Sequence, residues 1–210
     1  NKHQHSGSIP QHVAVIMDGN RRWAIERNES IYEGHRKGAD TLKKIIDFAQ
    51  EIGVKTFTAF AFSTENWKRP SFEVVQLMWL FEDFLQKQRK DMVKKGIRFH
   101  TIGNSEELPD SLRAVIDEVT HETKDGKGID LVLAINYGSR DEIVRASIKL
   151  AAAIKKGEIL EEEVDEKCFA SFLDTASWKE PDLLIRTSGE MRLSNFLLWQ
   201  LSYAEVYISP

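Results

Sequence analysis

The sequence predicts one α/β domain built on a mainly parallel sheet of about six strands. Short apolar segments alternate with helical segments along the chain, which is typical of parallel strands joined by right-handed helical crossovers. Two apolar segments, residues 13–17 and 129–135, lack polar alternation, as expected for strands buried on both faces. The 210 residues suit one domain with a substantial core, and the chain has no repeat or interdomain linker.

Strands are expected where short runs of β-branched and aromatic residues end in turn-forming residues. These runs are residues 13–17, 55–62, 97–102, 129–135, 183–185 and 206–208. Helices are expected where apolar residues recur at three-to-four spacing. The expected helices are 21–27, 37–52 (closed by Gly53), 71–95 (capped by Ser71 and stopped by Gly96), 107–124, 140–156 (closed by Gly157), 165–175 and 195–203. Residues 28–35 are expected to form a polar connection that contains Gly34.

The helix expected at 71–95 is apolar nearly all round between Val74 and Leu85. An ordinary surface helix shows a single apolar stripe, so this one needs apolar partners on several sides. A central core or dimer helix satisfies this pattern, and so does the wall of an apolar cavity. The residues leave both interpretations open.

Composition excludes several classes of protein. The net charge of −4 and the pI of about 5.9 argue against a general nucleic-acid binder. The single cysteine, Cys168, excludes an internal disulfide and fits a reducing, cytoplasmic location. No apolar run reaches the roughly 18 residues of a membrane span. Residues 1–8 are expected to be a disordered end or a cloning remnant, which leaves 9–210 as the functional domain.

Polar clusters follow four of the expected strands, at residues 18–23, 63–69, 136–139 and 186–194. The carboxyl ends of parallel strands share one edge of a sheet, so we expect these clusters to meet. Three of them carry arginine, which favours phosphate. Together with the apolar helix they indicate a ligand with an anionic head and a long apolar body.

Asp18 ends the first strand, and Arg21, Arg22 and a helix N-terminus follow it. The helix N-terminus and the arginines favour an anion, whereas the carboxylate repels one unless a divalent cation bridges the two. The simpler interpretation is that Asp18 and Asn20 only cap a helix. The P-loop, the Gly-x-Gly-x-x-Gly loop, Cys/His metal clusters and the Gly-x-Ser-x-Gly elbow are absent. So is the Asp-Asp-x-x-Asp motif of the helical trans-prenyl synthases.

Four motifs together resemble the cis-prenyltransferase family, and within it the bacterial undecaprenyl diphosphate synthases. They occur in family order over about residues 9–209. The motifs are His12-Val-Ala-Val-Ile-Met-Asp-Gly-Asn-Arg-Arg-Trp-Ala, Gly34-His35, Phe62-Ser-Thr-Glu-Asn-Trp-Lys-Arg-Pro70 and Asp182-Leu-Leu-Ile-Arg-Thr-Ser-Gly-Glu-Met-Arg-Leu-Ser-Asn-Phe-Leu-Leu-Trp-Gln200.

The resemblance implies a role for each matching residue. Asp18 and Asn66 are the implied catalytic residues, and Asp18 and Glu205 are the implied magnesium-linked acids. The allylic diphosphate is expected to contact Gly19, Asn20, Arg21, Arg22, Trp23, His35, Ser63, Thr64 and Glu65. Trp67 and Arg69 belong to the second catalytic loop, and Arg186, Arg192 and Ser194 are expected to hold isopentenyl diphosphate. Without the resemblance, Trp23 and Trp67 could be packing residues and Glu205 a surface acid.

The implied enzyme is a magnesium-dependent cis-prenyltransferase that condenses isopentenyl diphosphate onto an allylic diphosphate, with farnesyl diphosphate as the default primer. A long polyprenyl diphosphate such as undecaprenyl diphosphate, the precursor of a cell-wall lipid carrier, is the expected product. The resemblance also implies a single-domain fold with an apolar product tunnel, and a homodimer. Contact with the membrane surface during product release is expected because the product is insoluble in water. The alternatives are a synthase of another chain length and a non-catalytic family-like subunit.

The chain departs from the family pattern in three places. Arg21 stands where many bacterial members have glycine, and Ile31 stands where an arginine often contacts phosphate. The Trp-Pro-x-Phe segment and the basic tail of the family are not in the sequence, which puts dimer contacts and part of the isopentenyl diphosphate site in question.

Overall fold

Residues 8–210 form a single sheet of six parallel strands in the order β3-β4-β2-β1-β5-β6. The computed structural model describes residues 8–210, so the expectation for residues 1–8 lies outside the described part except at Ser8. The strands are β1 (His12–Ile16), β2 (Thr56–Ser63), β3 (Arg98–Ile102), β4 (Asp130–Tyr137), β5 (Leu183–Arg186) and β6 (Glu205–Ile208). The predicted fold class is confirmed.

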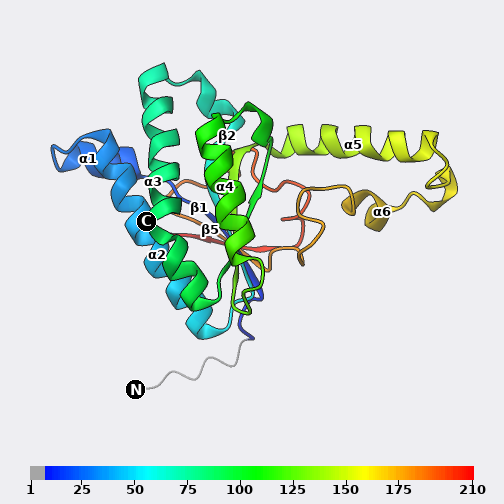
Figure 1. The fold of residues 1–210 in the computed structure, drawn as a ribbon, viewed down its shortest axis with the longest axis horizontal. Coiled ribbons are helices and arrows are strands. Elements are labelled where there is room, and N and C mark those ends of the chain that lie inside the picture. The colour runs from blue at the N-terminus through cyan, green and yellow to red at the C-terminus, as the bar shows by residue number, and fades with distance from the viewer. Residues whose placement is uncertain (1–7) are drawn as a thin grey trace.

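Helices connect the strands and cover the sheet. They are α1 (Asn20–Glu26), α2 (Ile31–Ile52), α3 (Ser71–Lys95), α4 (Asp110–Thr123), α5 (Ser139–Lys155) and α6 (Glu166–Ala170). Short 3-10 helices occur at η1 (Thr64–Lys68), η2 (Ser105–Glu107) and η3 (Glu161–Glu163). Figure 1 shows α2, α3 and α4 gathered on one side of the molecule, whereas α5 projects away from the sheet.

Two cores, one on each face of the sheet, explain why the central strands are continuously apolar. Val13 and Val15 of β1 belong to the core formed with α2, α3 and α4. Ala14 and Ile16 point to the opposite face, into a core that the segment 193–204 completes. Every residue of β1 and β4 is buried, so neither strand needs a polar face.

The second helix begins six residues earlier than the sequence indicates. Ser30 caps it by accepting a hydrogen bond from the backbone N–H of Glu33, so most of the expected polar connection is helical. Gly34 is a helical residue instead of a turn residue. A Cβ at Gly34 would lie 2.3 Å from the backbone oxygen of Asn20, so glycine is required by the close approach of α1 and α2.

The expected helix at 195–203 does not form, and the segment is a series of turns. Ser194, Asn195 and Leu197 have φ angles of 52°, 63° and 46°, which a right-handed helix cannot contain. These conformations allow the segment to bond to the start of α5: Ser139 N–H donates to the carbonyl of Asn195, and the Ser139 hydroxyl accepts from Leu198 N–H. Tertiary contacts therefore override a helical pattern here.

Other element boundaries differ by smaller amounts. Ser71 is the first residue of α3 and Pro70 occupies the cap position, so the expected serine cap is wrong. The start expected at residue 107 belongs to η2, and α4 begins at Asp110 after a proline. The helix expected at 165–175 is α-helical only at Glu166–Ala170 and then continues as turns.

Candidate active site

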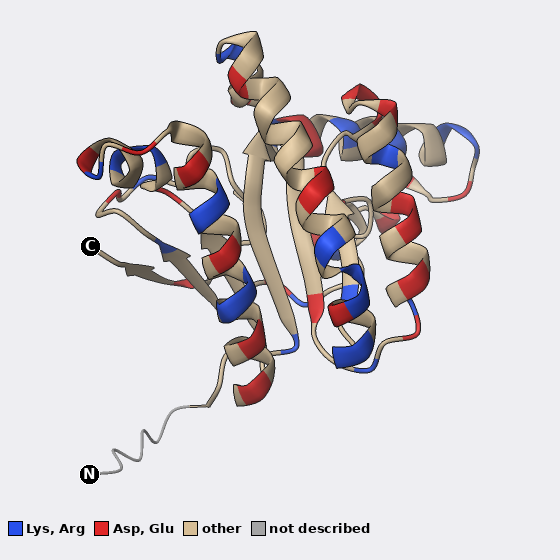
Figure 2. Cartoon of the chain, turned by 60° about the vertical axis from the view of Figure 1, so that its left-hand side comes forward, with Lys and Arg blue, Asp and Glu red and all other residues tan. Residues whose placement is uncertain are grey.

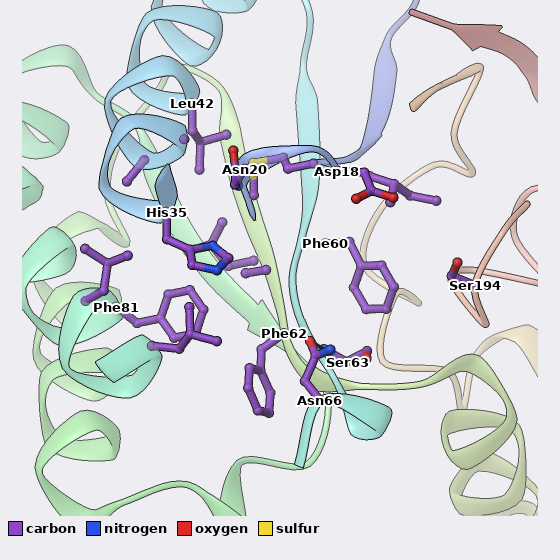
Figure 3. Close-up of a pocket in the computed structure, with 18 of the residues that line it drawn as sticks. Asp18, Asn20, His35, Leu42, Phe60, Phe62, Ser63, Asn66, Phe81 and Ser194 are labelled. Carbon is purple, nitrogen blue, oxygen red and sulfur yellow. Dashed lines mark hydrogen bonds between the residues drawn. The ribbon is translucent and has the colours of Figure 1, made fainter. Parts of the chain in front are cut away.

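One cavity of about 620 Å³ lies at the carboxyl ends of the strands, where the polar clusters meet. Polar and apolar side chains both line it, and Figure 3 shows Leu42 and Phe81 on the side away from Asp18 and Ser194. The polar lining residues are Asp18, Asn20, His35, Ser63, Glu65, Asn66, Arg69, Arg186, Ser194 and Asn195. The cavity therefore suits a ligand with one polar end and one apolar end.

Asp18 and Arg186 form the central ion pair of the polar part. They follow or end the neighbouring strands β1 and β5, and Arg186 Nη2 lies 2.8 Å from Asp18 Oδ2. Partial burial of Asp18 opposes its ionisation, but the hydrogen bonds from Arg186 and from Gly19 N–H, with the charge of Arg192, outweigh it and lower the pKa of Asp18. Asp18 is therefore an ionised carboxylate at neutral pH.

Backbone contacts hold the turn that carries Asp18. Gly19 has a φ of 98°, and a Cβ there would lie 2.6 Å from Ser188 Oγ. Glycine is therefore required both by the backbone conformation and by the close contact with Ser188. The Thr187 hydroxyl donates to the carbonyl of Asp18 at 2.7 Å and accepts from Asp18 N–H at 2.9 Å. The turns after β1 and β5 are thus joined directly.

Arg186 is 3% exposed, although it carries a permanent charge. Its Nη1 donates to Ser194 Oγ at 2.8 Å and to the carbonyl of Arg192. Its buried Nε has no hydrogen-bond partner among residues 8–210. This N–H is a buried polar group without compensation, so the ion pair with Asp18 and the Nη hydrogen bonds must hold the guanidinium in place.

Glu190 lies between two exposed arginines. Arg192 pairs with one of its carboxylate oxygens, and Arg22 lies 3.4 Å from the other. The side chains of Arg22 and Arg192 are 59% and 65% exposed, so each can turn toward a ligand at little desolvation cost. A bound anion can compete with Glu190 for both arginines.

Asn66 presents its amide nitrogen to the cavity. Its Oδ1 accepts a hydrogen bond from Ser63 N–H at 3.0 Å in a capping box of η1. Because the backbone N–H can only donate, this contact assigns the oxygen and leaves Nδ2 as the outward group. Asn66 is therefore arranged as a hydrogen-bond donor.

His35 lies on α2 and points into the cavity from the side opposite Asp18 (Figure 3). Burial lowers the pKa of His35, and the positive charges of Arg69 and Arg21 lower it further, against the opposing effect of Glu73. The imidazole is therefore neutral at pH 7. A neutral ring can accept one hydrogen bond and donate another beside an anion held by arginine.

The apolar part of the cavity lies between the sheet and the first turns of α3. Residues 74–81 contain no charged side chain, so this stretch of α3 is tan throughout in Figure 2. Its buried side chains pack on the sheet, whereas Val75 and Trp79 are 66% and 55% exposed. The apolar lining residues are Ile16, Met17, Ala39, Leu42, Phe60, Ala61, Phe62, Leu77, Leu80, Phe81, Phe84 and Leu133.

The remaining predicted site residues lie around this cavity instead of lining it. Gly19, Arg21 and Arg22 line a neighbouring hollow of about 440 Å³ that shares Asp18, Asn20, His35 and Arg69 with the cavity. Trp23 stacks under the guanidinium of Arg27, which lies 4.7 Å from the ring centre. Thr64 and Trp67 lie in η1, behind Glu65 and Asn66.

The structure does not bring Glu205 to Asp18 within one chain. Glu205 is in register with Leu183, whereas Ile208 is in register with Arg186, the partner of Asp18. Glu205 thus lies three residues back from the strand ends that carry the cavity. Within residues 8–210, the two acids that the resemblance links to magnesium therefore do not lie side by side.

Asp18 nevertheless fits a magnesium ion shared with a ligand. Mg²⁺ is commonly held by one or two carboxylates together with substrate phosphate oxygens. Each oxygen of Asp18 accepts one hydrogen bond and keeps a second lone pair. Within residues 8–210, no group of three or more His, Cys, Asp or Glu side chains could hold a metal ion. Phosphate oxygens would therefore supply much of the coordination.

Three contacts of the site were not anticipated from sequence. Thr187 bonds to the Asp18 turn, Glu190 joins Arg22 to Arg192, and Asn195 Nδ2 donates to Glu65 Oε1 at 3.0 Å. All three residues belong to the polar run that follows β5. Their position after a buried strand could have marked them as site residues. Their contacts could not be predicted, because the neighbours of each residue depend on strand order.

Cavity and charges together suit a ligand with a phosphate head and an apolar body. Residues 16–210 match the family model described as "Putative undecaprenyl diphosphate synthase". The ditrans,polycis-undecaprenyl-diphosphate synthase ((2E,6E)-farnesyl-diphosphate specific) of Micrococcus luteus is 46% identical over 98% of this chain and 82% of its own length. The isoprenyl transferase of Bacillus subtilis is 45% identical over 95% of this chain and 76% of its own length.

Two solved structures are similar to this chain in fold and in sequence. Lavandulyl diphosphate synthase of Lavandula x intermedia, in complex with dimethylallyl diphosphate, superposes with a TM-score of 0.94 at 41% identity, over 96% of this chain and 87% of that chain. A probable undecaprenyl diphosphate synthase of Campylobacter jejuni gives a TM-score of 0.78 at 34% identity, over 97% and 86%. The chain belongs to the undecaprenyl diphosphate synthase family of cis-prenyltransferases, and it is an enzyme of prenyl transfer.

Proposed function

We propose that the protein condenses isopentenyl diphosphate onto an allylic diphosphate, with farnesyl diphosphate as primer, to make a long cis-polyprenyl diphosphate such as undecaprenyl diphosphate. The observation that carries this proposal is one cavity that is lined both by Asp18 and Arg186 and by the phenylalanines of β2 and α3. A diphosphate can occupy the charged end while its prenyl chain lies against the rings.

The charged end is arranged for a leaving diphosphate. During condensation the allylic carbon–oxygen bond breaks, a carbon–carbon bond forms to isopentenyl diphosphate, and a proton leaves the new chain. Negative charge builds on the departing diphosphate, and donors that are already positioned stabilise it most. Arg186 supplies a fixed guanidinium, and Arg22 and Arg192 can be recruited from Glu190.

Asp18 would hold magnesium, which when bound would supply further charge stabilisation as a Lewis acid. The low pKa of Asp18 supports this role because the carboxylate needs no deprotonation before it binds a cation. Apolar walls at Phe60, Phe62 and Phe81 exclude water from the developing cation.

Asn66 is proposed to orient the group that accepts the proton. A neutral amide is a very weak base, and its oxygen is already engaged by Ser63 N–H. Its outward Nδ2 can instead donate to a diphosphate oxygen. We therefore assign the proton to a diphosphate oxygen that Asn66 positions.

A second copy of the chain is the proposed partner. Val144 and Ile148 are 57% and 64% exposed, four residues apart on the projecting helix α5. Val206 and Tyr207 of the edge strand β6 are each 57% exposed. Apolar surface of this kind favours an interface between protein chains.

A peripheral membrane contact is proposed for product release. Phe72, Val75 and Trp79 are more than half exposed and lie on the outer side of the helix that borders the cavity. Aromatic and aliphatic side chains in this arrangement suit the membrane interface. No described helix is both long and apolar enough to cross a bilayer. We place the reaction in the cytoplasm, at the membrane surface.

The test is incubation with farnesyl diphosphate, labelled isopentenyl diphosphate and magnesium, followed by separation of the extracted products by chain length. A chelator-sensitive ladder of polyprenyl products is expected. A parallel incubation replaces farnesyl diphosphate by dimethylallyl diphosphate, the ligand in the structure of the lavandulyl relative. A single ten-carbon product there, with no longer products from farnesyl diphosphate, would instead favour a synthase of short chains. No product from folded protein would favour a non-catalytic subunit.

A further inference from the structure

Asn136 is a buried polar residue that the proposed chemistry does not use. It lies in β4 one residue before the strand ends, and its exposed fraction is 0%. Its φ of 48° is left-handed, a conformation that asparagine tolerates better than most residues. A fully buried amide in this conformation calls for a structural or functional explanation.

The side chain of Asn136 makes three hydrogen bonds to two other segments, η1 and η2 with its cap residue. Its Oδ1 accepts from the indole N–H of Trp67 at 2.7 Å. Its Nδ2 donates to the carbonyl of Asn104 at 2.9 Å and to the Glu107 carboxylate at 3.0 Å. An indole N–H can only donate and a carbonyl can only accept, so these partners assign the amide orientation.

Trp67 connects Asn136 to the catalytic loop. It follows Asn66 directly in η1, and Arg69 comes two residues later. Its ring packs edge-on against Phe62, with 5.1 Å between ring centres, and its N–H points to Asn136. Asn66 and Arg69 line the cavity, whereas Trp67 belongs to the same loop but does not line the cavity.

We propose that Asn136 is a positioning residue that fixes the loop of residues 63–69 through the indole of Trp67. The inference rests on the proposed prenyl transfer and assigns Trp67 to holding the loop instead of to substrate contact. Asn66 and Arg69 sit on either side of the anchored tryptophan, so a shift of Trp67 moves both. Displacements of about 1 Å at reacting groups can cost about a hundredfold in rate.

Two substitutions separate the hydrogen bond from the packing around it. Trp67→Phe keeps an aromatic ring against Phe62 and removes the N–H donor together with part of the ring system, a loss of ring volume that the control below reproduces. Asn136→Gly keeps the left-handed backbone accessible and removes all three side-chain hydrogen bonds. The matched control is Trp178→Phe, whose ring packs edge-on to His100 away from the cavity, with 5.0 Å between ring centres.

The experiment measures three quantities for each variant: the unfolding temperature, hydrogen exchange of the amides at 63–69, and the single-turnover condensation rate at saturating substrates. Trp67→Phe is expected to unfold at a somewhat lower temperature than Trp178→Phe, because it leaves the buried Oδ1 of Asn136 without a donor. Its loop amides should exchange faster, and its rate should fall about tenfold or more. The double variant combines Trp67→Phe with Asn136→Gly. Its condensation rate should lie within about twofold of the rate of Asn136→Gly alone, because both substitutions break the same hydrogen bond.

Unchanged amide exchange at 63–69 in Trp67→Phe would overturn the proposal. So would a double variant whose condensation rate falls by the product of the two single-variant effects. If Asn136→Gly does not fold, the comparison of Trp67→Phe with Trp178→Phe still shows whether the tryptophan N–H anchors the loop. Failure of the wild type to condense prenyl diphosphates would refute the proposed function alone, since the exchange measurement reports the anchor without substrate.

Discussion

Arg186 is the residue at which stability and binding depend on each other. A guanidinium that is 3% exposed would be costly without a counter-charge, and Asp18 supplies it at 2.8 Å. Asp18 is only partly buried, so it can contact an ion or ligand on its open side while it pairs with Arg186. The same carboxylate therefore compensates a buried charge and faces the cavity.

Replacement of Asp18 by asparagine should nearly abolish prenyl transfer. The amide has the same size but carries no charge for a cation, and turnover is expected to fall at least about a hundredfold. Steady-state rates over a magnesium titration provide the measurement. Asp110→Asn, a change at a 93% exposed side chain on α4, is the control and should keep full activity. Equal rates in both variants would refute the role of Asp18.

Asn66→Ala should slow the chemical step and leave substrate binding nearly intact. The substitution removes the outward Nδ2 donor, and also the bond to Ser63 N–H that caps η1. Loss of one such oriented donor typically costs about 10² to 10³ in rate. Calorimetric binding of the allylic diphosphate, compared with single-turnover rates, separates the two effects. Full turnover in Asn66→Ala would contradict the assignment.

His12 should make the protein less stable in mild acid. Burial lowers the pKa of His12, despite opposing effects of the Lys179 carbonyl and nearby carboxylates. The Lys179 carbonyl accepts from Nδ1–H at 2.5 Å, so Nε2 is the acceptor for the Thr58 hydroxyl in the neutral ring. The unfolded chain therefore takes up the proton first, and stability is lost as pH falls below about 6.5.

The measurement is the free energy of unfolding between pH 7 and pH 5. Each proton contributes a slope of at most about 1.4 kcal/mol per pH unit, and His35 contributes in the same direction. His12→Gln should reduce the slope, whereas His121→Gln, on the exposed side of α4, should not. An unchanged slope in His12→Gln would contradict this account.

At the scale of elements, the sequence predicted strands more accurately than helix boundaries. Buried strands are marked by runs such as Val13 to Ile16 that no solvent-facing residue interrupts. The first residue of α2 and the turn conformation of residues 195–203 depend on contacts between segments that are distant in sequence. Gly34 looked like a turn residue because its partner, the carbonyl of Asn20, belongs to another helix.

Gly34→Ala should destabilise the protein although alanine favours helices. The propensity gain is about 1 kcal/mol, but the added Cβ would lie 2.3 Å from a backbone oxygen that cannot rotate away. Overpacking of this kind costs about 1–3 kcal/mol, so a net loss is expected. Denaturant unfolding compares it with Lys44→Ala, an exposed change on α2 that should stay within about 0.5 kcal/mol. A stabilised Gly34→Ala would show that α1 can move aside.

At the scale of the whole molecule, the strand order explains the site. β1 lies between β2 and β5, so the turns after these three strands meet although residues 18, 63 and 187 are far apart in sequence. Polar side chains of these turns surround one end of the cavity, and α2 and α3 enclose the other end.

The exposed side of α5 should be an interface in a homodimer. We expect the wild type to sediment at twice the chain mass and Ile148→Asp to sediment as a single chain, because the new charge would be buried against the partner. Ser147→Asp adds the same charge to a neighbouring position and is the control. A wild type that sediments as a monomer at micromolar concentration would refute the interface.

The sequence by itself determined the fold class, the family and most residues around the cavity, because buried strands and long motifs are local patterns. The tertiary structure decided which of those residues share one space. It placed Asp18 against Arg186, placed Glu205 away from both, and put Trp67 behind the loop against Asn136. These contacts depend on strand order, register and left-handed backbone at a few residues, which arise only when distant segments pack together.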